Sequence, residues 1–129
     1  MTVFHVEPLK RVNDIEFGMD RKSIRKLYNN RYNEFKKTVF SNNTTDDFDG
    51  FHIYYDSKDR CEAVEIFEGN EVFIGKKKIM PGDINNLKCE FPDIFVENDN
   101  CTSVKSSVGA YVEDGEIKSI LFGNVDYYK

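Results

Sequence analysis

The sequence has few of the residues on which catalytic and metal sites most often depend. Its 129 residues include two histidines, His5 and His52, and three cysteines. The cysteines form no CxxC pair and have no companion histidine at zinc-finger distance, so we expect no zinc site built from them. Because their number is odd and their spacing wide, Cys61, Cys89 and Cys101 are expected to be reduced thiols without a disulfide.

Long apolar runs are also missing. No stretch approaches the roughly 18 apolar residues that a membrane-spanning helix needs, and the first residues lack the positive start and apolar run of a secretory signal. We therefore expect a cytoplasmic protein that does not bind membranes. A chain of 129 residues, 40% of them hydrophobic, can bury one core but is short for two ordinary domains, so a single domain over residues 1–129 is predicted.

Charge is unevenly distributed along the chain, whose net charge is −5. Residues 1–40 carry 9 basic and 5 acidic side chains, whereas residues 41–129 carry 9 basic and 18 acidic side chains. A uniformly basic surface for nucleic acid is therefore not expected. The acidic part favours a basic partner, and the role of the basic N-terminal third stays open.

Two helices are predicted from their capping residues. Asp20 suits the N-cap of a helix that runs to about residue 29 or 30, and Asp83 suits a short second helix that Pro92 ends. In the first helix Leu27 is expected to be the central apolar contact with the sheet. Its apolar face consists of Ile24, Leu27 and Tyr28, and its solvated face consists mainly of Arg21, Lys22, Arg25 and Lys26.

Strands are predicted from alternating apolar and polar residues and from turn residues. The expected strands are residues 51–55, 61–68, 71–74, 107–112 and 116–122. The first two form a hairpin, the third continues it as a meander, and Asp114-Gly115 is a tight turn between the last two. The chain start around His5 is expected to be flexible, and residues 97–103 are expected to form an exposed loop. The predicted fold is α+β, a single antiparallel sheet of about five or six strands with two helices.

Catalytic and metal sites receive little support from spacing. His52 is the better candidate for a base, yet no Gly-x-Ser-x-Gly elbow accompanies it, and a strand histidine beside aromatic residues is more often structural. The acidic run at residues 46–49 lacks the glutamate that closes a calcium loop, and no glycine-rich loop could hold a phosphate. We expect no catalytic residue, no metal and no cofactor.

A mixture of acidic and aromatic residues is more informative. Aromatic side chains supply rigid area at protein interfaces, and nearby carboxylates steer a basic partner toward them. Tyr54 and Asp56 are expected to share one strand face, while Phe51, Ile53 and Tyr55 pack on the other. The residues predicted to bind a partner are Asp46, Asp47, Phe48, Asp49, Tyr54 and Asp56.

Several segments of the chain resemble a known family. They are Ile15-x-Phe17-Gly18-Met19-x-Arg21, Thr44-Thr45-Asp46-Asp47-Phe48, Cys61-Glu62-Ala63-Val64-Glu65-Ile66-Phe67, Ser119-Ile120-Leu121-Phe122-Gly123 and Tyr127-Tyr128. Together they are similar to small immunity proteins, or antitoxins, encoded beside LXG-type polymorphic toxins of Gram-positive bacteria, which are associated with type VII secretion. The resemblance implies a cytoplasmic protein, not an enzyme, that binds the toxic domain of its cognate toxin, often a nuclease, and occludes its active site.

Two other functions stay open on the residues alone. A small hydrolase would need His52 and the carboxylates of residues 46–56 to converge in a pocket. A homo-oligomeric structural or assembly subunit would need a large apolar patch that symmetry repeats. The placement of these side chains in the fold bears on each.

Overall fold

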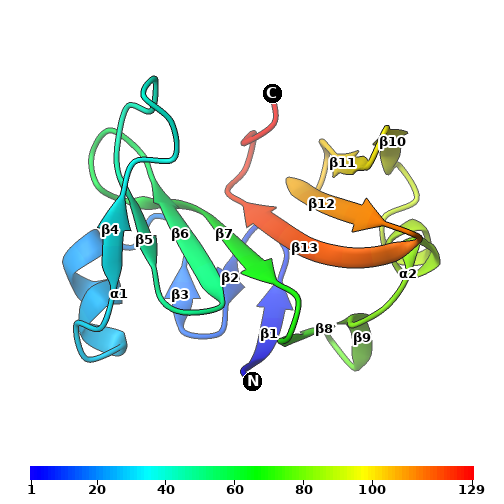
Figure 1. Ribbon diagram of the computed structural model, residues 1–129, viewed down its shortest axis with the longest axis horizontal. Coiled ribbons are helices and arrows are strands. Elements are labelled where there is room, and N and C mark those ends of the chain that lie inside the picture. Colours follow the sequence, from blue (N-terminus) through cyan, green and yellow to red (C-terminus); the bar gives the residue numbers. More distant parts are fainter.

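Two β-sheets and two short α-helices make up the computed structural model, which describes residues 1–129 (Figure 1). In spatial order, the five-stranded sheet consists of β3 (Ile15–Glu16), β2 (Arg11–Val12), β1 (Val3–Glu7), β8 (Glu71–Ile74) and β9 (Lys77–Met80). The eight-stranded sheet consists of β10 (Phe95–Glu97), β11 (Asn100–Ser103), β12 (Val108–Glu113), β13 (Glu116–Gly123), β7 (Cys61–Phe67), β6 (Phe51–Tyr55), β5 (Thr45–Asp47) and β4 (Asn33–Phe35). The helices are α1 (Arg21–Leu27) and α2 (Ile84–Glu90).

The predicted single sheet of five or six strands is wrong, because the chain leaves the expected meander after β7. The turn at Gly69 and Asn70 carries the chain into the other sheet, where β8 pairs in parallel with β1. The chain start is therefore a central strand and not a flexible end. Local patterning predicts where strands lie but not which distant strands pair, which explains the error. The α+β class is compatible with this arrangement.

Predictions that rest on local chemistry agree with the structure. β6 and β7 form the expected antiparallel hairpin, and Asp114 and Gly115 connect β12 to β13 with φ angles of 54° and 78°. Asp20 and Asp83 are the N-caps of the two helices. The expected loop at residues 97–103 is wrong, because β10 and β11 form a further hairpin there.

The chain passes between the two sheets through both helices and through the turn after β7. α1 follows β3 and precedes β4, while α2 follows β9 and precedes β10. Each N-cap residue also forms an isolated β-bridge, Asp20 with Arg60 and Asp83 with Glu116. Each helix start is thus held at a turn of the eight-stranded sheet. Neither helix has the length and apolar character that crossing a membrane would require.

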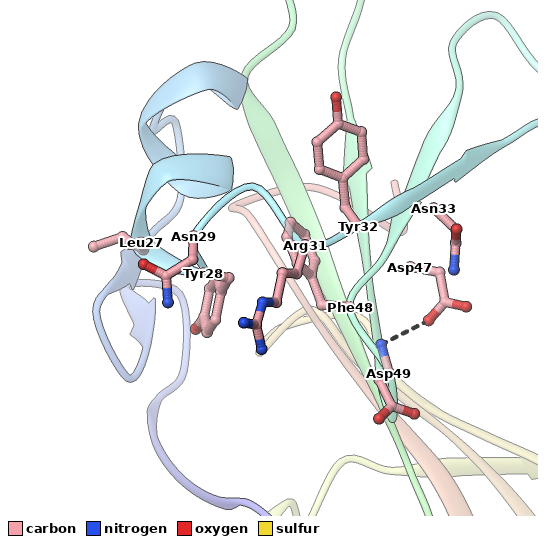
Figure 2. A pocket seen from close by; sticks show the side chains of 9 residues that line it. All are labelled: Leu27, Tyr28, Asn29, Arg31, Tyr32, Asn33, Asp47, Phe48 and Asp49. Carbon is pink, nitrogen blue, oxygen red and sulfur yellow. Dashed lines mark hydrogen bonds between the residues drawn. The ribbon is translucent and has the colours of Figure 1, made fainter.

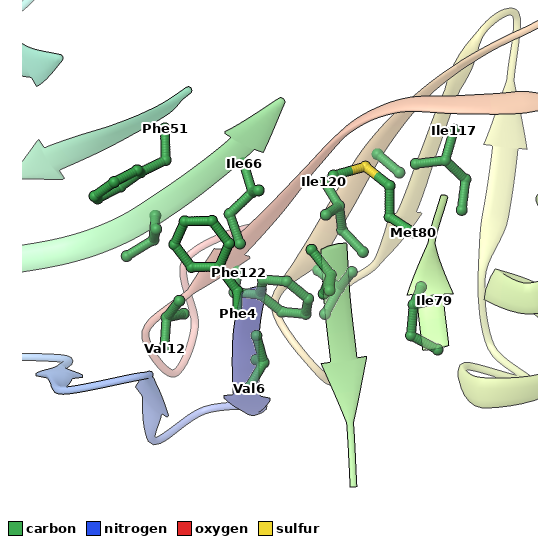
Figure 3. Packing of buried hydrophobic residues seen from close by; sticks show 14 of the residues in the cluster. Phe4, Val6, Val12, Phe51, Ile66, Ile79, Met80, Ile117, Ile120 and Phe122 are labelled. Carbon is green, nitrogen blue, oxygen red and sulfur yellow. The ribbon is translucent and has the colours of Figure 1, made fainter. Parts of the chain in front are cut away.

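The main core lies between the two sheets and contains 24 buried residues. In Figure 3, Phe4 and Val6 from the five-stranded sheet face Ile66 and Phe122 from the eight-stranded sheet. Asn70 closes one end of this core: its side chain donates to the carbonyl oxygens of Gly50 and Phe67 and accepts from the backbone N–H of Thr2. These bonds tie the crossing turn to both sheets.

The packing of α1 differs from the prediction. Ile24 is fully buried, whereas Leu27 is 44% exposed, so Leu27 is not the central contact. The helix ends at Leu27, and its inward face consists of residues 21, 24 and 25, with Tyr28 at the C-cap packing against the core. The apolar face was misassigned because two arginines belong to the buried side. The three cysteines are free thiols, two buried and Cys89 exposed.

We predict that Ile24→Ala lowers the free energy of unfolding by about 2 to 4 kcal/mol, because it removes fully buried methyl groups. Leu27→Ala is the matched control on the same helix and should cost less than about 1 kcal/mol. Urea unfolding of both variants measures the difference. Equal losses in the two variants would contradict the docking of α1 described above.

Candidate functional site

The six predicted binding residues lie in different environments, because they belong to strands whose side chains alternate between two faces. In the pairing of β5 with β6, Asp46 lies opposite Ile53 on the inner face and Asp47 lies opposite His52 on the outer face. Asp46, predicted to bind a partner, is 0% exposed and is therefore not accessible to one. Asp47 is half-buried and Asp49 is exposed.

The three other predicted residues are less accessible than expected. Phe48 and Tyr54 are buried, with exposed fractions of 8% and 7%. Tyr54 lies on the sheet face opposite the main core, as predicted, but residues near the C-terminus pack over it. The carboxylate of Asp56 accepts hydrogen bonds from the backbone N–H groups of Lys58 and Arg60, so it stabilises the turn between β6 and β7.

Asp46 is the centre of a buried ion-pair network beneath α1. The Arg25 guanidinium binds both its oxygens, with Nε and Nη2 each 2.8 Å from one oxygen. Arg21 Nη2 lies 3.2 Å from Oδ1, and the Tyr55 hydroxyl donates to Oδ2 at 2.9 Å. Arg21 continues to Asp59 at 3.0 Å. The predicted solvated face of α1 is therefore wrong for both arginines, although Lys22 and Lys26 are exposed.

The protonation of this network follows from its contacts. Burial alone would raise the pKa of Asp46, but the hydrogen bonds from Arg25, Arg21 and Tyr55 outweigh it and lower that pKa. Burial and the neighbouring Asp46 raise the pKa of Tyr55. Asp46 is thus ionised and Tyr55 is neutral at neutral pH. With every oxygen of Asp46 engaged, its role in this fold is structural.

Part of the predicted site lines an open groove of about 610 Å³ between the end of α1 and the turn from β5 to β6 (Figure 2). Its aromatic residues are in mutual contact: the ring centroid of Phe48 lies 5.1 Å from that of Tyr28 and 6.3 Å from that of Tyr32. Asp47 and Asp49 line the opposite side, joined by a 2.9 Å hydrogen bond from the Asp49 N–H to the Asp47 carboxylate.

The charges in the groove are not all neutralised by neighbours. Asp49 and Arg31 take part in no ion pair of the structure, and Asp47 has only His52, at 3.6 Å. Burial lowers the pKa of His52 despite the opposing effects of Asp47 and Glu65. His52 is therefore neutral at neutral pH, and the Asp47 carboxylate keeps its charge available.

The outer face of the eight-stranded sheet carries a second set of polar side chains. Cross-strand pairing places Asp47, His52, Glu65, Leu121 and Gly109 in one continuous row. The residues that sequence reasoning missed here are Glu65 and Lys37. Glu65 carried no signal beyond its place in a predicted strand, and nothing local marks Lys37.

The C-terminal residues form the cover of this face. Tyr127 and Tyr128 pack on a small cluster of Tyr54, Ala63 and Leu121. Two glycines make room for them: a Cβ at Gly109 would lie 2.0 Å from the Tyr128 hydroxyl oxygen, and a Cβ at Gly123 would lie 2.7 Å from Tyr127 Cβ. In Figure 1 the C-terminal segment accordingly lies above β13, between the two halves of the sheet.

The carboxylates required for a hydrolase do not converge on His52. Asp46 lies on the opposite face with its arginines, Asp56 is engaged by a turn, and only Asp47 contacts the imidazole. The ring of His52 packs edge-on against Phe67 and Phe35, with centroids 4.6 Å and 5.1 Å away. No group of three or more His, Cys, Asp or Glu side chains is placed to hold a metal ion.

We predict that Asp46→Asn lowers the free energy of unfolding by about 3 kcal/mol or more, because it leaves the buried Arg21 and the half-buried Arg25 with less countercharge. Asp49→Asn is the control: it makes the same chemical change at an exposed position with positive φ, which asparagine also tolerates, and should cost less than about 0.5 kcal/mol. Both values come from urea unfolding at neutral pH.

The same pair of proteins gives a pH test. Because folding lowers the pKa of Asp46, its contribution is present above the unfolded-state pKa of about 4 and is lost as pH falls through the lower folded-state value. The stability difference between wild type and Asp46→Asn should therefore shrink at pH values below about 4. A difference that stays constant down to acid unfolding would contradict the ionised state of Asp46.

Comparison of the chain with protein-family models, curated proteins and solved structures found no match. The resemblance to immunity proteins therefore depends on the sequence segments alone.

Proposed function

We propose that this protein is an immunity protein that binds the toxic domain of a cognate toxin, with a nuclease as the expected target, and occludes its active site. The observation that carries the proposal is the groove of Figure 2, in which aromatic side chains lie beside two carboxylates that lack a charged partner of their own. It is supported by the sequence resemblance and by the acidic character of residues 41–129.

The chemistry of the groove suits a basic protein surface. Lysine and arginine side chains bury their aliphatic stems on apolar groups while the charged head stays near water. Here Tyr28 and Phe48 offer the apolar contact, and Asp47 and Asp49 offer the charge. Arg31 extends between Tyr28 and the Asp49 turn (Figure 2), so the same groove also presents a donor for one acidic side chain of the partner.

The groove is also held in shape before any partner arrives. One wall is formed by residues at the end of α1 and just after it, and the other by residues at the end of β5 and just after it. Asp46 links α1 to β5 through Arg21 and Arg25. A surface that is ordered in advance loses less conformational entropy on binding, which favours tight association. Tight association is what neutralisation of a toxin requires. Asp46 therefore supports the proposed interface without belonging to it.

The function is tested by co-expression. Each reading frame adjacent to the gene of this chain is expressed in a bacterial host with and without the chain, and growth is measured. We expect one neighbour to be toxic alone and to be neutralised by co-expression, with a complex recoverable by copurification. If no neighbour is toxic, or if toxicity persists beside a well-expressed chain, the proposal fails.

The interface is tested with a charge-neutralised pair of variants. Asp47→Asn with Asp49→Asn should slow association with the toxin domain, most at low salt, because exposed charges act through long-range steering. The control is Glu97→Gln with Asp99→Asn, the same change in charge on the exposed hairpin of β10 and β11. Association rates at two salt concentrations decide the matter: equal slowing in both pairs would move the interface away from the groove.

A further inference from the structure

A pocket of about 310 Å³ on the outer face of the eight-stranded sheet has the chemistry of a site for a cationic side chain. It crosses β7, β13, β12 and β11, and Tyr128 from the C-terminal segment lines it. Its acidic group is Glu65, which is half-buried. The tyrosine hydroxyl of Tyr54 donates to one oxygen of Glu65, and the Ser119 hydroxyl lies 3.3 Å from the other.

Glu65 has hydrogen bonds but no countercharge. It takes part in no ion pair of the structure. Its partner across the strand pair is His52, whose lowered pKa leaves it neutral. Burial and the bond to Glu65 raise the pKa of Tyr54, so the hydroxyl remains a donor and adds no charge. A carboxylate held in this way is an acceptor for an incoming cation.

The chain already brings a cation to this place. Lys37, from the irregular segment between β4 and β5, has its ammonium nitrogen 4.6 Å from the centroid of the Tyr54 ring. Lys37 lines this pocket, which contains Glu65, and also a smaller neighbouring one of about 190 Å³, which Tyr54 lines. Its backbone belongs to an exposed segment, so the lysine can withdraw without disturbing the sheet. The aromatic face of Tyr54 is thus a cation–π surface with a resident occupant.

We propose that this pocket and its smaller neighbour, which Lys37 joins, receive a lysine or arginine side chain of a protein partner, which replaces Lys37 on Tyr54 and pairs with Glu65. The inference deepens the proposed function and rests on it for the identity of the partner. Asp47 connects the two surfaces, because it lines the groove of Figure 2 and lies in the same cross-strand row as Glu65. One basic partner could therefore contact both.

The cation preference is tested without the partner. Acetyl-arginine amide is titrated into the protein, and binding is followed by NMR through the ring resonances of Tyr54 and Tyr128. Acetyl-citrulline amide, which has a similar shape and no charge, is the control probe. Only the arginine probe should shift these resonances. An equal response to both probes would overturn the proposal.

Two substitutions with opposite expected effects sharpen the test. Lys37→Ala should tighten binding of the arginine probe by about two- to fivefold, because the resident cation–π contact is removed. Glu65→Gln should weaken binding by at least a similar factor. Lys36→Ala is the matched control, since it removes the same charge from an exposed neighbour that lines neither pocket, and it should leave binding unchanged.

The outcomes separate this inference from the proposed function. If Lys37→Ala and Lys36→Ala bind the probe alike, or if Glu65→Gln binds as wild type does, the pocket is not the cation site. Lys37 is exposed, so Lys37→Ala is expected to fold and still tests the cation site even if Glu65→Gln is unstable. If the arginine probe binds as expected but no adjacent gene encodes a toxin that the chain neutralises, the proposed immunity function fails and the cation site stands. A toxin complex that Glu65→Gln leaves unchanged would exclude the pocket from that interface.

Discussion

The attachment of α1 to the eight-stranded sheet depends on one buried carboxylate. A helix of seven residues is too short to be stable by itself, so its order has to come from tertiary contacts. Ile24 supplies an apolar contact, but Arg21 and Arg25 occupy the rest of the inward face and need Asp46 beneath them. Removing these charges from water is costly, and the cost is offset only because the Tyr55 hydroxyl and the Arg25 fork satisfy the carboxylate fully.

The strand that contains Asp46 also organises both candidate surfaces. Because side chains alternate along β5, the burial of Asp46 turns Asp47 to the outer face, where it meets His52. The next residue, Phe48, returns to the inner side and forms part of the groove beside α1. Structural and binding roles thus alternate residue by residue. A change of register by one residue would expose the ion-pair network and bury the charge of Asp47.

Sequence reasoning succeeded where neighbouring residues decide the structure. The hairpin of β6 and β7, the Asp114-Gly115 turn and the two aspartate N-caps all follow from local chemistry. It failed where a distant partner decides, as in the pairing of Val3 with Glu71 that creates the second sheet. The predicted site residues lie in different environments for the same reason. Asp47 and Asp49 line a groove, whereas Asp46 is buried by two arginines that the prediction had assigned to the solvated face of the helix. The spacing of residues 21, 24, 25 and 28 at i, i+3, i+4 and i+7 was the signal that could have assigned them.

Glycines within strands were a second sequence feature that could have indicated the packing of the C-terminal segment. A glycine inside a strand weakens the strand and often marks a place where another group approaches closely. Gly109 and Gly123 each leave room for a C-terminal tyrosine. Tyr128 then becomes a wall of the pocket that contains Glu65. A ligand that contacts Tyr128 in this pocket would therefore stabilise the docked C-terminal segment. The same packing covers one part of Tyr54, and the Lys37 ammonium lies over its ring, so a new cation can reach this ring once Lys37 moves away.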